Sequence, residues 1–193
     1  MLINKQRGEI NFKIVYYGVA EGGKTTNLEY IHSHINPNQR TKLISIKTEG
    51  DRTLYFDFLH IELSAINGFK PKFNFYTVPG QTVYSASRKL VLRGADGVVF
   101  VADSQEQRIA ENHASLAELR VYLNGNGNGR SFSEFPFILQ CNKQDLPAAI
   151  PAEKLREELE LSTQPYFGTV ATAGDMVFDT MKAIINRVTK RLS

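Results

Sequence analysis

The stretch Gly18-Val19-Ala20-Glu21-Gly22-Gly23-Lys24-Thr25 matches the pattern G-x-x-x-x-G-K-[ST] at every defined position. It follows Ile10–Tyr17, a run rich in β-branched and aromatic residues that we predict to be a strand. After the stretch, Leu28 and Ile31 recur at helical spacing. A strand, a glycine loop and a helix in this order are the context in which such a loop cradles phosphates.

The residue types of this loop suit an anion. Gly18, Gly22 and Gly23 allow backbone N–H groups to converge on a phosphate without Cβ clashes. The N-terminus of the following helix adds its partial positive charge. Lys24 is expected to reach the β- and γ-phosphates, and the Thr25 hydroxyl to ligate Mg²⁺. The alternative is a glycine-rich turn with a solvated lysine, and the flanking strand and helix argue against it.

Length and composition indicate one ordinary globular domain over residues 1–193. The chain is 42% hydrophobic and 22% charged, which is typical of soluble domains with a sizeable core. Its net charge of +3 is small and does not favour nucleic acid as a partner. A single cysteine, Cys141, excludes an intrachain disulfide, fits a reducing compartment and is expected to be buried.

Targeting and membrane signals are missing from the sequence. It shows no signal peptide, no stretch of about 18 apolar residues, no glycine after Met1 and no C-terminal prenylation cysteine. We therefore expect a cytoplasmic protein without a direct membrane anchor, which a partner would carry to any membrane that it visits.

Strands and helices are predicted to alternate along most of the chain, which indicates the α/β class. Gly97–Asp103 is continuously apolar up to its last residue, as expected of a central parallel strand covered on both faces. We predict six strands in a mainly parallel sheet, with five helices on its two faces.

The segment Leu54–Leu63 is strongly apolar on both of its predicted faces and leaves two interpretations open. It is either a strand buried in the core or an edge strand that a partner covers, because a bare apolar edge invites aggregation.

A second motif, Asn142-Lys143-Gln144-Asp145, follows a predicted buried strand, where α/β folds bind their ligands. A carboxylate such as Asp145 can accept two parallel N–H bonds, and guanine offers N1–H beside its 2-amino group, whereas adenine offers no such pair. The aliphatic stem of Lys143 can cover the base, and Asn142 can tie this loop to the phosphate loop. Alone, the motif could be a polar turn, but its position after a phosphate loop favours a guanine-nucleotide site.

With both motifs in place, the chain resembles the small Ras-like GTPases, and within them the bacterial MglA group, which controls cell polarity and gliding motility. The resemblance covers nearly all of the chain and implies a Ras-like G domain of the P-loop NTPase fold. It rests on Gly18–Thr26, Thr48-Glu49-x-x-Arg52-Thr53-Leu54, Phe56–Leu59, Thr77-Val78-Pro79-Gly80-Gln81, Ala86–Leu90, Asn142-Lys143-x-Asp145-Leu146-Pro147 and Val170-Ala171-Thr172.

The resemblance assigns roles around the phosphates. Thr53 is similar to a switch threonine that joins Thr25 on Mg²⁺ when a γ-phosphate is present, and Gly80 to the glycine whose N–H senses that phosphate. Gln81 is similar to the glutamine that orients the attacking water, and Arg52 to an arginine finger supplied within the same chain.

The expected site is therefore a set of loop residues. Gln81 and Arg52 are the expected catalytic residues, and Thr25 and Thr53 the expected metal ligands, while Ala171 resembles a backbone contact to the guanine carbonyl. The expected contacts to GTP or GDP are Gly18, Glu21, Gly22, Gly23, Lys24, Thr25, Thr26, Thr53, Gly80, Asn142, Lys143, Asp145, Val170, Ala171 and Thr172.

Three positions depart from the Ras-like pattern. Ala20 stands where many members have glycine, and Glu21 adds a negative charge to an anion-binding loop, although we expect its side chain to point outward. Thr77 stands where most members have the aspartate that supports Mg²⁺. These departures predict retained nucleotide binding, slow hydrolysis and weaker support of Mg²⁺.

Together these observations predict a GTP-binding molecular switch with slow GTPase activity, which acts on polarity effectors. The resemblance implies a dimeric Roadblock-domain activating protein that docks near Leu54–Leu63, and recruitment to a cell pole by partners. A hydrolysis-deficient scaffold that holds its nucleotide is the first alternative. A P-loop ATPase or small-molecule kinase is the second, and the motif Asn142–Asp145 argues against it.

Overall fold

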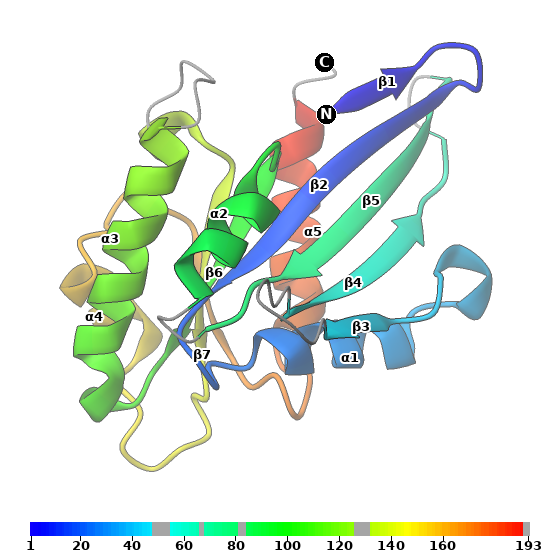
Figure 1. Cartoon of the computed structure of the whole chain (residues 1–193). Helices are drawn as coiled ribbons and strands as arrows, with labels where there is room; N and C mark the ends of the chain where they lie inside the picture. The colour runs from blue at the N-terminus through cyan, green and yellow to red at the C-terminus, as the bar shows by residue number, and fades with distance from the viewer. Residues whose placement is uncertain (48–54, 66–67, 81–83, 126–131, 191–193) are drawn as a thin grey trace.

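A single mixed β-sheet runs through the middle of the computed structural model, and helices cover both of its faces (Figure 1). The structure describes residues 1–47, 55–65, 68–80, 84–125 and 132–190. The N-terminus and the end of the last described helix, Val177–Thr189, lie near each other at one end of the molecule, opposite the glycine loop of residues 18–23 (Figure 1).

The strands follow the order β3-β4-β5-β2-β6-β7-β8, and β1 pairs with β2 outside this path. β2 pairs in parallel with β5 and β6, β6 with β7, and β7 with β8, whereas the pairs β1–β2, β3–β4 and β4–β5 are antiparallel. Their bounds are β1 Leu2–Asn4, β2 Glu9–Gly18, β3 Ile44–Lys47, β4 Tyr55–Glu62, β5 Lys70–Thr77, β6 Gly97–Asp103, β7 Phe137–Asn142 and β8 Tyr166–Thr169.

The predicted α/β class and the helices on both faces are confirmed, but the number of strands was wrong. Within the described residues the sheet has eight strands rather than six. The short strand Leu2–Asn4 has three exposed residues and cannot display the alternation that identifies a strand in a sequence. It forms because the chain folds back on β2 in a hairpin, and the N-terminal ammonium pairs with Asp96.

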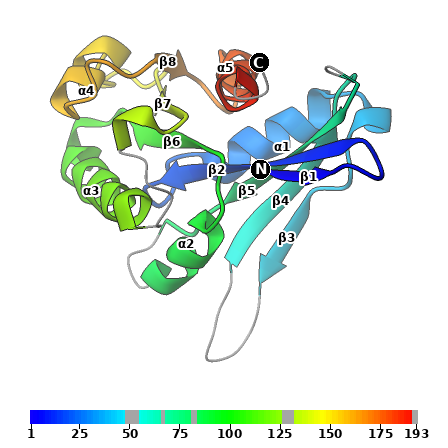
Figure 2. The same ribbon diagram turned by 90° about the horizontal axis from the view of Figure 1, so that it is seen from above.

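The five predicted helices are all present. They are α1 Lys24–His34, α2 Ser85–Leu92, α3 Ile109–Gly125, α4 Ala152–Glu158 and α5 Val177–Thr189. α1 and α5 cover one face of the sheet, and α2, α3 and α4 cover the other (Figure 2). No helix in the described part of the chain is both long and apolar enough to span a bilayer.

Each face of the sheet has its own hydrophobic core. One core joins β2, β5 and β4 to α1 and α5, and the other joins β6 and β7 to α2, α3 and α4. Every residue of β6 is buried, as its continuous apolar sequence predicted. Cys141 is also buried, and this burial raises the pKa of its thiol to about 12.

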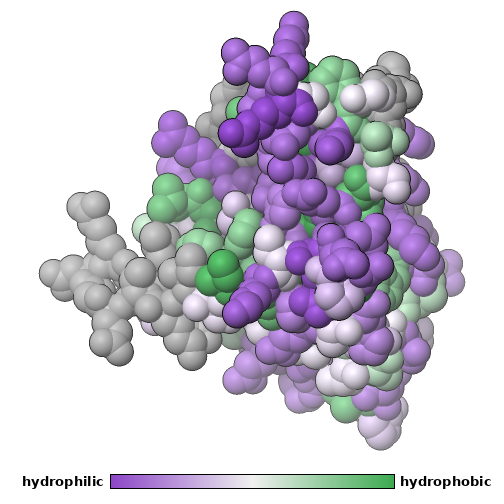
Figure 3. All heavy atoms as spheres, turned by 90° about the vertical axis from the view of Figure 1, so that its right-hand side faces the viewer, coloured by the Kyte–Doolittle hydropathy of each residue, from purple (hydrophilic) through white to green (hydrophobic). Residues whose placement is uncertain are grey.

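The segment Leu54–Leu63 provides β4, which pairs with β3 on one side and β5 on the other and is therefore not an edge strand. Leu59 and Ile61 are fully buried, whereas Phe56 and Phe58 on the opposite face are half-buried. The edge strand next to β4 is β3, and the side of the molecule that carries β3 is mainly hydrophilic, with smaller apolar patches (Figure 3). The interpretation as a core strand is correct for one face of β4 only.

Leu119→Ala should lower the free energy of unfolding by about 2–5 kcal/mol, because Leu119 is fully buried in the core under α3 and its removal leaves a cavity. Leu90→Ala is the matched control, since Leu90 also lies on a helix but is 54% exposed. Its effect should stay within about 0.5 kcal/mol. Urea unfolding followed by circular dichroism compares the two, and equal losses would contradict the described core.

Candidate nucleotide-binding site

A cavity of about 470 Å³ opens against the loop between β2 and α1. Parallel strands direct their carboxyl ends to one edge of a sheet, and the loops that follow β2 and β5 meet at this edge. The lining residues of this first cavity are Ala20, Glu21, Gly23, Lys24, Thr25, Thr26, Thr77, Val78, Pro79, Gly80 and Tyr84.

Lys24 is the main cationic group of the first cavity and is only 6% exposed. Its Nζ donates hydrogen bonds to the backbone carbonyls of Gly18 (3.0 Å) and Val19. Burial lowers the pKa of Lys24 to about 7, and the nearby charges of Arg88 and Arg108 act in the same direction. An anion placed beside this ammonium would stabilise its charged form, so the donor set fits a phosphate.

Two glycines permit contacts that a side chain would block. Gly23 has a φ of +98°, and a Cβ on it would lie 2.2 Å from Nδ2 of Asn142. A Cβ on Gly80 would lie 2.3 Å from both the Cα and the backbone nitrogen of Ala20. The loop after β5 therefore packs backbone to backbone against the phosphate loop, and Gly80 lines the first cavity.

A second cavity of about 240 Å³ adjoins the first, and Glu21, Gly23 and Thr26 line both. The remaining lining residues of the second cavity are Asn142, Lys143, Asp145, Leu146, Ala171 and Thr172. The structure therefore brings the two sequence motifs, which lie about 120 residues apart, onto one continuous depression, as a nucleotide with a base and phosphates requires.

Asn142 connects three of the loops around this depression. Its Nδ2 donates a hydrogen bond to the carbonyl of Gly22 (2.8 Å). Its Oδ1 accepts hydrogen bonds from the backbone N–H of Ala171 (2.9 Å) and the hydroxyl of Thr169 (3.1 Å). Because Asn142 is buried, these bonds are shielded from water and fix the phosphate loop relative to the base loops.

The base loop is anchored from β6. Lys143 adopts a φ of +70°, and its Nζ lies 2.7 Å from Oδ2 of the buried carboxylate Asp103. Gln144 donates hydrogen bonds to the Ser104 hydroxyl (2.6 Å) and the Ile150 carbonyl (3.0 Å). These contacts leave Asp145 exposed at the rim of the second cavity, where a base can approach its carboxylate.

At the start of α1, the Thr25 hydroxyl donates a hydrogen bond to Oδ2 of Asp57, at 2.6 Å. Asp57 lies on β4 and is 2% exposed. Oxygen ligands of this kind suit Mg²⁺, which in phosphate sites is held by few protein groups and shares its ligands with the phosphates. The residues present therefore fit the metal that the sequence implies.

The structure places most of the expected contact residues at the two cavities. Glu21 is exposed, as expected of its outward-pointing side chain, and Thr26 is half-buried between the cavities. Val170 lies beside the second cavity, where its backbone pairs with Asp175. The expected switch and catalytic residues Arg52, Thr53 and Gln81 lie outside the described residues.

Two site residues were missed by the sequence analysis. The first is Asp57, and its signal was a lone acidic residue within an apolar strand. The second is Arg108, whose Nη2 donates a 2.7 Å hydrogen bond to the carbonyl of Ala20, 88 residues away in the chain. Nothing in the local sequence marks Arg108, because its partner is a backbone carbonyl of a distant loop.

Comparison with known proteins identifies the family. Residues 1–188 match the ADP-ribosylation factor family model. The chain is 50% identical to the mutual gliding-motility protein MglA of Myxococcus xanthus, over 98% of this chain and 96% of that protein. It is also 25% identical to ADP-ribosylation factor-like protein 2 of Drosophila melanogaster, over 100% of this chain and 95% of that protein. The chain therefore belongs to the small Ras-like GTPases of the ADP-ribosylation factor family and, within them, to the MglA group.

Proposed function

We propose that this protein is a GTP-dependent molecular switch with slow intrinsic hydrolysis, which acts in cell polarity or gliding motility. The observation that carries the proposal is the set of hydrogen bonds from Asn142 to Gly22, Ala171 and Thr169. They hold a phosphate loop and a base loop in one rigid arrangement, which is what recognition of a whole nucleotide needs.

Guanine is the base that the second cavity favours. Asp145 offers two carboxylate oxygens at its rim, and Ala171 and Thr172 line the same cavity. A site built on a bidentate contact rejects the wrong base, because the carboxylate would be left desolvated and unpaired. This argument supports GTP and GDP over ATP and ADP.

The switch behaviour rests on the contact between the loop after β5 and the phosphate loop. Gly80 packs on Ala20, and Arg88 of α2 donates a 3.4 Å hydrogen bond to the Pro79 carbonyl. A γ-phosphate bound between these loops would contact Gly80 and Thr53. The resulting shift of the loop after β5 would reach α2 through the hydrogen bond between Arg88 and Pro79. GTP would thus create a partner surface that hydrolysis removes.

Hydrolysis would use Gln81 to orient the attacking water and Arg52 to stabilise charge on the transferred phosphoryl group. Thr25 would hold Mg²⁺ together with Thr53, and the bound metal would neutralise charge on the phosphates. By resemblance, a dimeric Roadblock-domain protein would accelerate the reaction. Polarity effectors would read the GTP state and recruit the cytoplasmic protein to a cell pole.

Asp145→Asn should weaken GDP binding by at least about 100-fold, because two hydrogen bonds to a charged acceptor are worth several kcal/mol. The same variant should bind xanthosine diphosphate more tightly than the wild type does, since an amide offers one acceptor and one donor. Competition titration against a fluorescent GDP analogue measures both affinities.

Asp179→Asn makes the same chemical change at an exposed position on α5 and is the matched control, with no expected effect. An unchanged GDP affinity in Asp145→Asn would remove Asp145 from the site. Equal affinities of the wild type for GDP and ADP would instead favour a P-loop ATPase or kinase.

Arg52→Ala and Gln81→Ala should each slow single-turnover GTP hydrolysis by about tenfold or more, by analogy with arginine supplied in cis and glutamine in other GTPases. GTP affinity should change little, because both groups act on the transition state rather than on the bound substrate. Phosphate release followed in a stopped-flow fluorimeter provides the rates.

Arg7→Ala is the control for loss of an arginine, since Arg7 is exposed in the turn between β1 and β2. If the wild type releases phosphate no faster than buffer, with and without a Roadblock-domain partner, the protein is a hydrolysis-deficient scaffold.

A further inference from the structure

Asp57 is a buried carboxylate held by three hydroxyl groups. Its Oδ2 accepts hydrogen bonds from Thr25 Oγ1 (2.6 Å) and Thr77 Oγ1 (2.9 Å), and its Oδ1 accepts one from Ser45 Oγ (2.7 Å). Its backbone N–H also donates to Thr77 Oγ1 (2.8 Å). Four hydrogen bonds thus fix one acidic residue, which is only 2% exposed.

The buried Lys24 ammonium acts on Asp57 electrostatically, but the groups that donate hydrogen bonds to the Asp57 carboxylate are neutral hydroxyls. Within the described part of the chain, none of the ion pairs involves Asp57. A buried carboxylate that only neutral hydroxyls hold is costly, and its charge is best stabilised by a cation. The hydroxyl of Thr25, the residue expected to ligate Mg²⁺, contacts it directly.

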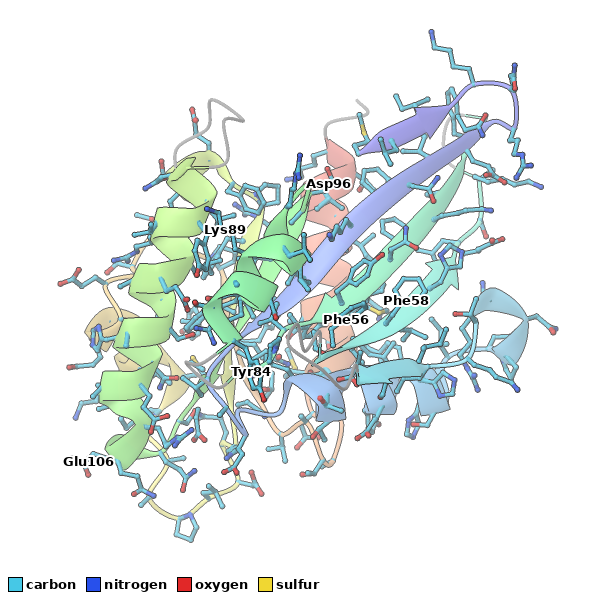
Figure 4. All side chains as sticks on the ribbon, in the orientation of Figure 1. Phe56, Phe58, Tyr84, Lys89, Asp96 and Glu106 are labelled. Atoms are coloured by element: carbon cyan, nitrogen blue, oxygen red, sulfur yellow. The ribbon has the colours of Figure 1, made fainter. Side chains whose placement is uncertain are left out.

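The strand register explains how a residue of β4 reaches the phosphate site. Phe58 pairs with Tyr76 in the antiparallel pair β4–β5, so Asp57 lies beside Thr77. Phe56 and Phe58 pack against Tyr76 on the face of β4 that Figure 4 presents. Side chains alternate along a strand, so Asp57 points to the opposite face, where α1 begins.

Thr77 therefore has a different role from the one expected. The sequence predicted weaker support of Mg²⁺ because Thr77 stands where most Ras-like proteins have an aspartate. In the structure the Thr77 hydroxyl orients a carboxylate that comes from the neighbouring strand, one position across the sheet. A carboxylate is therefore present beside position 77, although it belongs to β4 rather than β5.

We propose that Asp57 is the carboxylate that supports Mg²⁺ beside Thr25, and that Thr77 and Ser45 are its positioning residues. The other acidic residue of the first cavity, Glu21, is exposed and lacks these contacts. This inference rests on the proposed function, since Mg²⁺ binds such a site together with a guanine nucleotide.

The test measures release of a fluorescent GDP analogue as a function of free Mg²⁺, and reads the Mg²⁺ concentration that gives half of the maximal slowing. Asp57→Asn should raise this midpoint by about 10–100-fold, the usual loss when a group that supports a metal is removed. The double variant Asp57→Asn/Thr77→Asp should return the midpoint toward the wild-type value, because the carboxylate is then supplied by β5.

Mn²⁺ titration followed by electron paramagnetic resonance gives a second readout that does not depend on nucleotide release. Asp179→Asn is the control and should leave both midpoints unchanged. A purely structural role of Asp57 would lower the melting temperature of Asp57→Asn without moving the midpoints, and this result would overturn the proposal.

Ser45→Ala tests the proposal even if Asp57→Asn does not fold. This variant keeps the Asp57 carboxylate and removes one of the hydroxyls that donate a hydrogen bond to it. Its Mg²⁺ midpoint should rise severalfold, and an unchanged midpoint would count against the proposal. GDP binding by the wild type at saturating Mg²⁺ separates the two levels of inference. A wild type that binds no GDP contradicts the proposed function, whereas GDP binding with an unshifted midpoint contradicts only the role of Asp57.

Discussion

The hydrogen bonds of the buried Asn142 side chain hold the site together. One amide group contacts the phosphate loop at Gly22, the end of β8 at Thr169 and the loop after β8 at Ala171. A buried amide that lost these partners would leave polar atoms unsatisfied, so the three loops are stable only in this mutual arrangement. The glycine at position 23 follows from the same constraint, because a Cβ there would collide with the Asn142 amide.

The sheet provides the frame on which this contact depends. Parallel strands β2, β5, β7 and β8 bring their carboxyl ends to one edge, and each is followed by a loop that lines the depression. The fully buried strand β6 fixes the spacing between the phosphate loop and the base loop. Asp103 at its end pairs with Lys143 across this spacing, so the core and the site share one set of residues.

The antiparallel strands β3 and β4 extend the sheet beyond this frame and bring a different kind of group to the phosphates. Ser45 of β3 and Thr77 of β5 hold the Asp57 carboxylate from both sides of β4. Its position therefore depends on the register of two antiparallel pairs, and a slip of one residue would turn the carboxylate to the other face. Any movement of β4 would change the hydrogen bond from Thr25, at the start of α1, to Asp57.

Elements whose signal is local could be predicted from the sequence. The phosphate loop and the motif Asn142–Asp145 are contiguous, because a loop that wraps one ligand group needs neighbouring residues in fixed order. The helices and the buried strand β6 were predictable for the same reason. Their hydrophobic patterns, periodic in the helices and continuous in β6, lie within short stretches of the sequence.

Contacts between distant segments became visible only in the folded structure. The hairpin of Leu2–Asn4, the tether from Arg108 to Ala20 and the partners of Asp57 join segments whose pairing no local pattern records. The absence of an aspartate at position 77 led us to expect weaker support of Mg²⁺. A linear comparison cannot show which side chain of the neighbouring strand lies beside Thr77. Only strand order and register place Asp57 there, and these are set by the packing of the whole sheet.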